Sequence, residues 1–161
     1  MIVKEVMNRK VTTCRPYSTL ETAAILMWDN DCGTVAVVDD ENKAIGIITD
    51  RDICMAVALQ HKSPSDIQVQ EIMSQQLYTC EPESDIINAL KTLSFQKVRR
   101  LPVTDSNGHV EGMISIVDLI THAERGRRGI QIPELSYDDT MTTLKAVCRQ
   151  QPAMDTATGT D

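Results

Sequence analysis

Two short motifs contain the residues best suited to chemistry. The first reads GIITDRD over residues 46–52, and the second reads GMISIVD over residues 112–118. Each has a glycine, two apolar residues, a hydroxyl residue and, three positions later, an aspartate. Where such a motif joins a strand to a helix, free amides and the hydroxyl can hold a phosphate. The aspartate can accept both hydroxyls of a ribose, so the motifs favour a nucleotide site.

Arginines near these motifs add positive charge. Arg51 lies inside the first motif, and Arg99 and Arg100 lie a short distance before the second. A guanidinium group binds phosphate through two parallel hydrogen bonds. These arginines are therefore candidate phosphate ligands.

The motifs also have a purely structural interpretation. Thr49 and Asp52 have the spacing of a helix N-cap, and a glycine in a strand can mark only a bulge. Two occurrences in register favour a ligand more than one occurrence would. A repeated cap without any ligand would nevertheless give the same pattern.

Both motifs belong to an internal repeat with a spacing of 66 residues and no gap. When residues 3–53 are aligned with residues 69–119, 13 of the 51 positions are identical. A unit of this size cannot easily bury its own hydrophobic face, so its twin is the natural partner. Two similar units packed together also form two similar clefts.

Each copy is predicted to read strand, helix, strand, strand, helix. Ser18 and Glu21 have the spacing of a capping box, and apolar residues at three- and four-residue steps follow them. Ser84 occupies the same place in the second copy. Strands are expected over 11–14, 34–38, 44–48 and 101–104, closing helices over 51–59 and 117–123, and a linker over 60–67.

The predicted fold class is α/β (α+β), with two pseudo-symmetric β-α-β-β-α repeats packed through their sheets. The expected boundaries are 1–62 for the first repeat, 63–124 for the second and 125–161 for a C-terminal tail. Within the tail, residues 135–147 have the apolar spacing of one more helix. Residues 150–161 are rich in Thr, Ala, Asp and Gly and are expected to be disordered.

Composition excludes several functional classes. Sixteen basic and 23 acidic residues give a net charge of −7, which argues against a dedicated binder of nucleic acid or anionic membranes. No apolar run approaches the ~20 residues that span a bilayer, and no signal-peptide pattern is found. We therefore expect a cytoplasmic protein with no nucleic-acid or membrane partner.

Nothing in the sequence indicates catalysis or a metal centre. The five cysteines are too far apart in sequence for a zinc knuckle or a CxxC redox site, and we expect reduced thiols that lie mostly in the core. The three histidines are isolated from one another, and no nucleophile–base pair or Walker loop is found. The cysteines are Cys14, Cys32, Cys54, Cys80 and Cys148, and the histidines are His61, His109 and His122.

The repeats resemble a tandem pair of cystathionine-β-synthase (CBS) domains. The resemblance covers about residues 2–124 and rests on four features, several of which occur in both copies in the same order. These are the opening VKEVM (3–7) and VQEIM (69–73), the TCRPYS (13–18) and TCEPES (79–84) segments before the helices, the VRRLPVTD segment (98–105), and the two glycine-to-aspartate motifs. The family is a sensor scaffold with varied ligands.

The resemblance implies a regulatory module that binds AMP, ADP, ATP or S-adenosylmethionine in two clefts between the repeats. In the family, each motif aspartate holds a ribose and the hydroxyl residue meets phosphate. Carried over by position, one cleft would use Thr49, Arg51 and Asp52 with Thr79, Val98, Arg99 and Arg100. The other would use Ser115 and Asp118 with Thr13, Cys32, Gly33 and Thr34.

The two predicted clefts are unequal. Only the first has several arginines, since Ile116 and Val117 replace Asp50 and Arg51 in the second copy. In addition, Ala36 departs from the proline that the family has at this place, whereas Pro102 keeps it. We therefore expect phosphorylated ligands beside Asp52, and a weaker, empty or less charged site beside Asp118.

No resident cofactor is expected; the adenine nucleotide is a regulatory ligand, with or without Mg²⁺. The expected partners are a second copy of the chain and an unidentified regulated protein. Trp28 and the apolar sides of the first-repeat helix favour the homodimer. The alternative is a structural or dimerisation module whose clefts have lost their ligand.

Overall fold

The computed structural model describes residues 1–124 and 133–148. The first repeat contributes α1 (Val3–Val6), β1 (Thr13–Cys14), α2 (Leu20–Asp29), β2 (Thr34–Val38), β3 (Ala44–Thr49) and α3 (Asp50–Gln60). A 3₁₀ turn (Pro64–Asp66) leads to α4 (Val69–Ile72), α5 (Ile86–Gln96), β4 (Arg100–Thr104), β5 (Val110–Ser115) and α6 (Ile116–His122). The last described helix is α7 (Tyr137–Cys148), which confirms the helix expected in the tail. The disorder expected for 150–161 lies outside the described residues.

The strands form two small sheets, one in each repeat. In the first sheet β1 runs parallel to β2, and β2 pairs antiparallel with β3. In the second sheet β4 pairs antiparallel with β5. Cys80, the equivalent of the β1 residue Cys14, makes only an isolated parallel bridge to Val103. The fold class predicted from the sequence is confirmed.

The helix caps correct one prediction. The N-cap of α2 is Thr19, whose side chain accepts from Thr22 N, and not Ser18. Ser18 lies one residue before the cap, in a turn where its amide donates to Arg15 O. The N-cap of α5 is likewise Asp85, one residue after Ser84. Both helices therefore begin one residue later than the capping-box spacing indicates.

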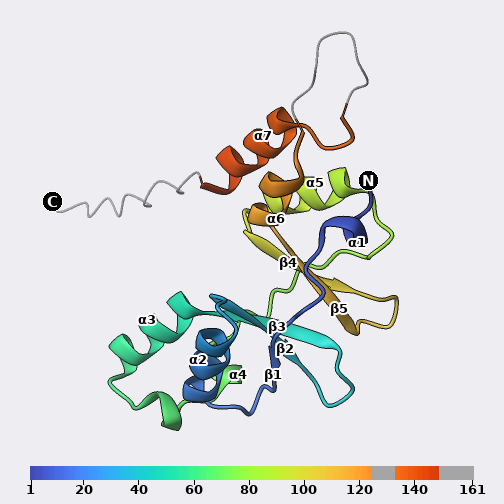
Figure 1. The fold of residues 1–161 in the computed structure, drawn as a ribbon. Helices are drawn as coiled ribbons and strands as arrows, with labels where there is room; N and C mark the ends of the chain where they lie inside the picture. Colours follow the sequence, from blue (N-terminus) through green and yellow to red (C-terminus); the bar gives the residue numbers. More distant parts are fainter. Residues whose placement is uncertain (125–132, 149–161) are drawn as a thin grey trace, which may run out of the picture.

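The short helices α1 and α4 pack on the opposite repeats. Val3 N donates to Ser84 O at 2.9 Å, and α1 joins the hydrophobic core of the second repeat. Val69 N donates to Ser18 O at 2.8 Å, and α4 joins the core of the first repeat. Figure 1 shows α1 beside β5 and α6, and α4 beside α2. This exchange ties the two repeats together at both ends.

The motif glycines make room for the exchanged segments. A Cβ on Gly46 would lie 2.8 Å from Met73 Sδ and 3.0 Å from Ser74 O, and one on Gly112 would lie 2.5 Å from Met7 Sδ. These contacts follow from backbone pairing of Ser74 with β3 and of Asn8 with β5. The motif glycines therefore allow the Met73–Ser74 and Met7–Asn8 segments to approach the strands closely.

The two β-hairpin turns also pair across the repeats. Ala44 N donates to Gly108 O at 2.9 Å, and Val110 N donates to Asn42 O at 3.4 Å. Gly108 has φ +90° and Asn42 has φ +63°, which glycine and asparagine tolerate. The contact joins the sheets at the ends far from the motifs.

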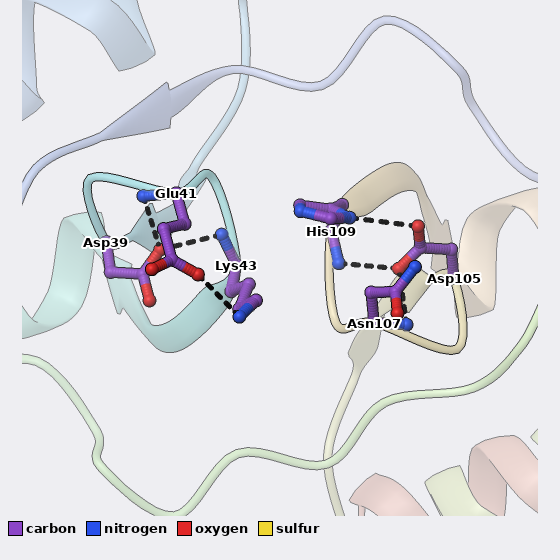
Figure 2. A network of polar contacts seen from close by, with 6 residues as sticks. All are labelled: Asp39, Glu41, Lys43, Asp105, Asn107 and His109. Carbon is purple, nitrogen blue, oxygen red and sulfur yellow. Dashed lines mark hydrogen bonds and ion pairs between the residues drawn. The ribbon is translucent and has the colours of Figure 1, made fainter.

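Each turn is closed by one aspartate, as Figure 2 shows. Asp39 Oδ1 accepts from the amides of Glu41 and Lys43 at 3.0 and 2.9 Å, and Asp105 Oδ1 accepts from those of Asn107 and His109, both at 2.8 Å. The second turn has an extra bond between His109 Nδ1 and Asp105 Oδ2 at 2.9 Å. Equivalent aspartates therefore stabilise equivalent turns.

Each repeat has its own hydrophobic core. Val35, Val37 and Ile48 are fully buried in the first, and Leu101 and Ile114 are fully buried in the second. Every β2 residue is buried, which explains why four apolar residues follow Thr34 without interruption. No described helix is long and apolar enough to cross a membrane.

Helix α7 makes the two repeats different. It packs on α5 and α6 (Figure 1), and Leu135 and Val147 join the second core. On the first repeat, no described element covers the corresponding side of α2 and α3. Four large apolar side chains are exposed there, namely Ile25, Trp28, Met55 and Leu59.

Candidate nucleotide site

Both motifs form capping boxes at strand-to-helix junctions. Thr49 ends β3 and caps α3: its Oγ1 accepts from Asp52 N at 3.2 Å. In return Asp52 Oδ2 accepts from Thr49 N at 2.9 Å and from Thr49 Oγ1 at 2.7 Å. The structural interpretation of this motif, a helix cap, is confirmed.

The second junction repeats the first. Asp118 Oδ2 accepts from Ser115 N at 2.8 Å and from Ser115 Oγ at 2.5 Å. In both boxes only Oδ2 is occupied, and Oδ1 has no hydrogen-bond partner among residues 1–124 and 133–148. The cap fixes each carboxylate and leaves one oxygen for another group.

The start of the neighbouring strand lies beside each junction. Asp50 N donates to Gly33 O at 3.2 Å, and Thr34 pairs in register with Thr49. The second repeat does the same, because Ile116 N donates to Arg99 O at 3.1 Å and Arg100 pairs with Ser115. Each junction therefore meets the β2 or β4 start of its own repeat through the backbone.

One side chain crosses from repeat to repeat at the junctions. Arg100 Nη1 donates to Thr34 Oγ1 at 2.8 Å. Thr34 is 7% exposed, and Arg100 is half-buried. Since Thr34 is in register with Thr49, the guanidinium lies near the first junction although its own backbone borders the second. The sequence assigned Arg100 and Thr34 to different clefts, and the structure brings them together.

No side-chain hydrogen bond joins the remaining candidate residues to Arg100 or Thr34 in the described part of the chain. Thr13 pairs with Ala36 on β2, and Thr79 precedes the bridged Cys80. Val98 follows α5, and its amide donates to Leu93 O at 3.2 Å. The side chains of the two remaining candidate arginines, Arg51 and Arg99, are exposed, and within the described part of the chain they make no side-chain hydrogen bond or ion pair.

The described pockets lie elsewhere. One of about 500 Å³ between α2 and α3 is lined by Trp28, Asp31 and Asp50, and it includes Cys32 and Gly33 from the candidate set. It holds two carboxylates and no cation, so it does not suit a phosphate. A second pocket of about 640 Å³ is lined by residues of α5 and α7 and includes no candidate residue. We assign the candidate site from the junction geometry and the arginines.

The cysteines are only partly in the core. Burial raises the pKa of Cys14 to about 11 and that of Cys80 to about 12, so both are unreactive thiols at neutral pH. Cys54 and Cys148 are exposed, contrary to the expectation that most thiols are buried. Among the described residues, no group of three or more His, Cys, Asp and Glu side chains could hold a metal ion.

The sequence contains only a partial signal for the Arg100–Thr34 contact. The two positions are 66 residues apart, which is the repeat spacing. Equivalent residues can touch only where they lie on the pseudo-two-fold axis. The spacing alone does not say which equivalent pairs lie there, so the contact needed the structure.

Comparison with known proteins identifies both repeats. A family model described as CBS domain matches residues 3–59 and 69–125. An uncharacterised protein of Methanopyrus kandleri, MK0525, is 35% identical over 118 residues, which are 73% of this chain and 60% of that protein. The CBS domain-containing protein YhcV of Bacillus subtilis is 32% identical over 117 residues, covering 73% of this chain and 81% of YhcV.

Solved structures agree with this similarity. The CBS domain pair of protein MJ0100 was solved in complex with 5′-methylthioadenosine and S-adenosyl-L-methionine. It superposes with a TM-score of 0.68 at 23% identity, over 75% of this chain and 94% of that one. At this identity the likeness establishes a shared fold.

Proposed function

Because this chain belongs to the CBS domain family, with one domain in each repeat, we propose that it senses adenosyl ligands and regulates a partner protein. The proposed ligands are AMP, ADP, ATP and S-adenosylmethionine, with or without Mg²⁺ for the phosphorylated ones. They bind in the two clefts between the repeats, beside the strand-to-helix junctions. The adenosyl ligands of the MJ0100 domain pair support this ligand class.

The observation that carries the proposal is the position of the Arg100 guanidinium. It reaches Thr34 of the other repeat at 2.8 Å, and Thr34 is in register with Thr49, which ends β3 and caps the helix that carries Asp52. A cation, a helix N-terminus and an oriented carboxylate therefore converge on one place. Phosphate suits the first two groups and ribose hydroxyls suit the third.

The capping boxes prepare the carboxylates for a ribose. Asp52 Oδ2 is held by two bonds from Thr49, which fixes the side-chain rotamer before any ligand arrives. Its Oδ1 then accepts ribose hydroxyls without a further loss of rotamer freedom. Pre-organisation of this kind improves affinity because less entropy is lost on binding.

The two clefts differ in charge. Arg51 follows the first junction, whereas Val117 occupies the same place after the second. We propose that phosphorylated ligands bind beside Asp52 and that the Asp118 cleft takes a less charged ligand. We assign no catalytic role to either cleft, since the groups that converge there are caps and cations.

We also propose that the protein is cytoplasmic and forms a homodimer. Trp28 is 87% exposed and Leu59 is 71% exposed on the open face of α2 and α3. Large exposed apolar patches mark protein–protein interaction sites, and a second copy of the chain is the partner proposed for this one.

A module without ligand is the second candidate, and the capping boxes favour it. Asp52 and Asp118 both stabilise helix starts, so the repeated motif has a structural use even in an empty cleft. In that case the chain would mediate assembly alone. The two candidates differ in whether any adenosyl compound binds.

Thermal unfolding in the presence of AMP, ADP, ATP, NAD and S-adenosylmethionine separates the candidates. A ligand at a hundred times its dissociation constant adds about 2.7 kcal/mol of stability. We expect such a shift with at least one adenosyl compound, and ultraviolet-absorbing nucleotide in gently purified protein would agree with it. If none of the compounds shifts unfolding at millimolar concentration, the ligand-free module is the better account.

A further inference from the structure

The pocket between α2 and α3 has a chemistry that the proposed nucleotide does not use. Its volume is about 500 Å³, within the range of pockets that hold small molecules. Ala24, Met27 and Ile53 form an apolar part of its wall. Among the described residues that line it, only Asp31 and Asp50 are charged, and both are acidic. The pocket therefore combines an apolar wall with negative charge.

No neighbouring cation neutralises the two carboxylates. Asp50 Oδ1 accepts from the backbone amide of Arg51 at 2.7 Å, and the Asp31 side chain makes no hydrogen bond in the described part of the chain. The ion pairs found among the described residues involve other carboxylates. Two like charges that line one pocket repel each other, and a bound cation relieves this repulsion.

Trp28 adds an aromatic surface that suits a cation. It lines the pocket and is 87% exposed. The face of an indole ring attracts ammonium groups, and tryptophan is the best of the aromatic residues for this contact. Since Trp28 is also part of the open face of α2 and α3, the pocket lies beside the proposed homodimer interface.

The second repeat indicates that the fold does not require these three residues. It forms the equivalent elements α5, β4, β5 and α6. The residues one repeat spacing, 66 positions, after Trp28, Asp31 and Asp50 are Ser94, Lys97 and Ile116. The second repeat therefore folds without an aromatic ring or a carboxylate at these positions, and in the first repeat these side chains are available for a ligand.

We propose that the pocket between α2 and α3 binds an aliphatic diamine. Its ammonium groups pair with Asp31 and Asp50, and one of them lies against the Trp28 indole. Its alkyl chain contacts the apolar wall. A metal ion does not suit the pocket, because no group of three or more His, Cys, Asp and Glu side chains in the described structure could hold one. Diamine binding goes beyond the proposed function and needs no nucleotide at the junctions.

Calorimetric titration of the full chain with putrescine, a diamine with an ammonium group at each end, tests the site. Butanediol with a hydroxyl group at each end is the neutral control, and MgCl₂ at equal ionic strength is a divalent cation without an alkyl chain. We expect putrescine to bind and the two controls not to compete with it. If putrescine does not bind at millimolar concentration, or if Mg²⁺ displaces it, the proposed diamine site is wrong.

Asp31→Asn tests whether putrescine binds in this pocket. Asp31 has φ +48°, which asparagine also tolerates, so the variant removes a charge without new backbone strain. Because Asp31 is exposed and exposed ion pairs are weak, we expect the putrescine affinity to fall by about fivefold. Asp29→Asn is the matched control, since Asp29 is an exposed carboxylate at the end of α2 that does not line the pocket. We expect its putrescine affinity to stay unchanged.

The variants separate the pocket from the general charge of the chain. If Asp29→Asn weakens putrescine binding as much as Asp31→Asn, attraction to an acidic surface explains the binding and the pocket is not the site. If Asp31→Asn binds putrescine as tightly as the natural chain, the pocket is again excluded. Thermal unfolding without ligand checks that both variants are folded. Failure of the diamine site leaves the proposed nucleotide function standing, because that function is tested with adenosyl compounds alone.

Discussion

At the scale of single residues, Asp52 and Asp118 each use one carboxylate oxygen to cap a helix and keep the other oxygen available for a ligand. Oδ2 of each carboxylate closes a capping box, and Oδ1 points to no described partner. The two residues have nearly identical local bonds. They differ in their surroundings, because the Arg100 guanidinium reaches Thr34 beside the first junction, and Arg51 in α3 is replaced by Val117 in α6. Any difference between their variants therefore reports on ligand binding.

We predict that Asp52→Ala and Asp118→Ala lose similar stability and unequal affinity. Loss of a capping group costs about 0.5–2 kcal/mol in either case. A hydrogen bond from a ribose hydroxyl to a carboxylate contributes about 1.5–3 kcal/mol, so Asp52→Ala should weaken AMP binding at least tenfold. Denaturant unfolding and calorimetry measure the two quantities. Equal losses of AMP affinity would show that the charge asymmetry does not direct the ligand.

The turn residue Asp105 gives a prediction for pH. Its hydrogen bond with His109 and two backbone amides lower its pKa to about 2 in the folded chain. A lowered carboxylate pKa stabilises the fold above the unfolded-state pKa, and this stabilisation is lost as the pH falls towards 2. In His109→Gln we expect the Asp105 pKa to rise towards the ordinary aspartate value. Carboxyl NMR titration checks this, and an unchanged pKa would mean that His109 is not the cause.

At the scale of elements, the strands and closing helices were predictable and the exchange of α1 and α4 was not. Buried β-branched runs and three- and four-residue apolar steps report local structure, so β2, β3, α3 and α6 follow from the sequence. A four-residue helix has too few positions to show periodicity. The local sequence around Val3 does not indicate which repeat it packs on, because both repeats have a hydrophobic core.

The candidate site was predictable to a similar degree. The motif spacing located Thr49, Asp52, Ser115 and Asp118 at strand-to-helix junctions, and the structure has them there. The structural duty of Gly46 and the Arg100–Thr34 bond depend on contacts between distant segments. Such contacts are set by the packing of the repeats and leave no mark in a single motif.

The exchanged segments make Gly46 intolerant of a side chain. In Gly46→Ala the new Cβ would lie 2.8 Å from Met73 Sδ and 3.0 Å from Ser74 O. The Met73 side chain can move, but the paired backbone of Ser74 cannot move freely. We predict a loss of about 1–3 kcal/mol of unfolding free energy, as for other overpacked sites.

Gly33→Ala is the control for this effect. Its Cβ would meet the Asp50 carboxylate at 2.9 Å, and that side chain is exposed and can turn away. We expect a clearly smaller loss in denaturant unfolding. If both variants lose the same stability, the close strand approach is not what requires Gly46.

At the scale of the whole molecule, α7 breaks the symmetry of two similar repeats. It covers the helical side of the second repeat, whereas the α2 and α3 side of the first repeat is open in the described structure. The open face gathers Ile25, Trp28, Met55 and Leu59. Two copies of the chain can each bury this face by pairing through it.

We predict that Trp28→Ala shifts the protein from dimer to monomer. Exposed tryptophans at the centre of an interface commonly contribute 2 kcal/mol or more to binding, which is about a 30-fold change in the dissociation constant. Phe95→Ala is the matched control, because Phe95 is 84% exposed on α5, beside α7. Light scattering at micromolar concentration should give one chain mass for Trp28→Ala and two for Phe95→Ala. If the natural chain has the mass of one chain, the homodimer prediction is wrong. If Trp28→Ala is still a dimer, the face of α2 and α3 is not the dimer interface.

The central claim is that a phosphorylated adenosyl ligand binds beside Asp52 through the arginines, and titration with AMP and adenosine at two salt concentrations tests it most directly. Guanidinium–phosphate bonds are strong but are screened by salt where solvent reaches them. We predict that AMP binds more tightly than adenosine, that only its affinity falls as salt rises, and that Arg100→Ala removes most of the difference. Equal affinities of AMP and adenosine, unaffected by salt, would contradict the claim.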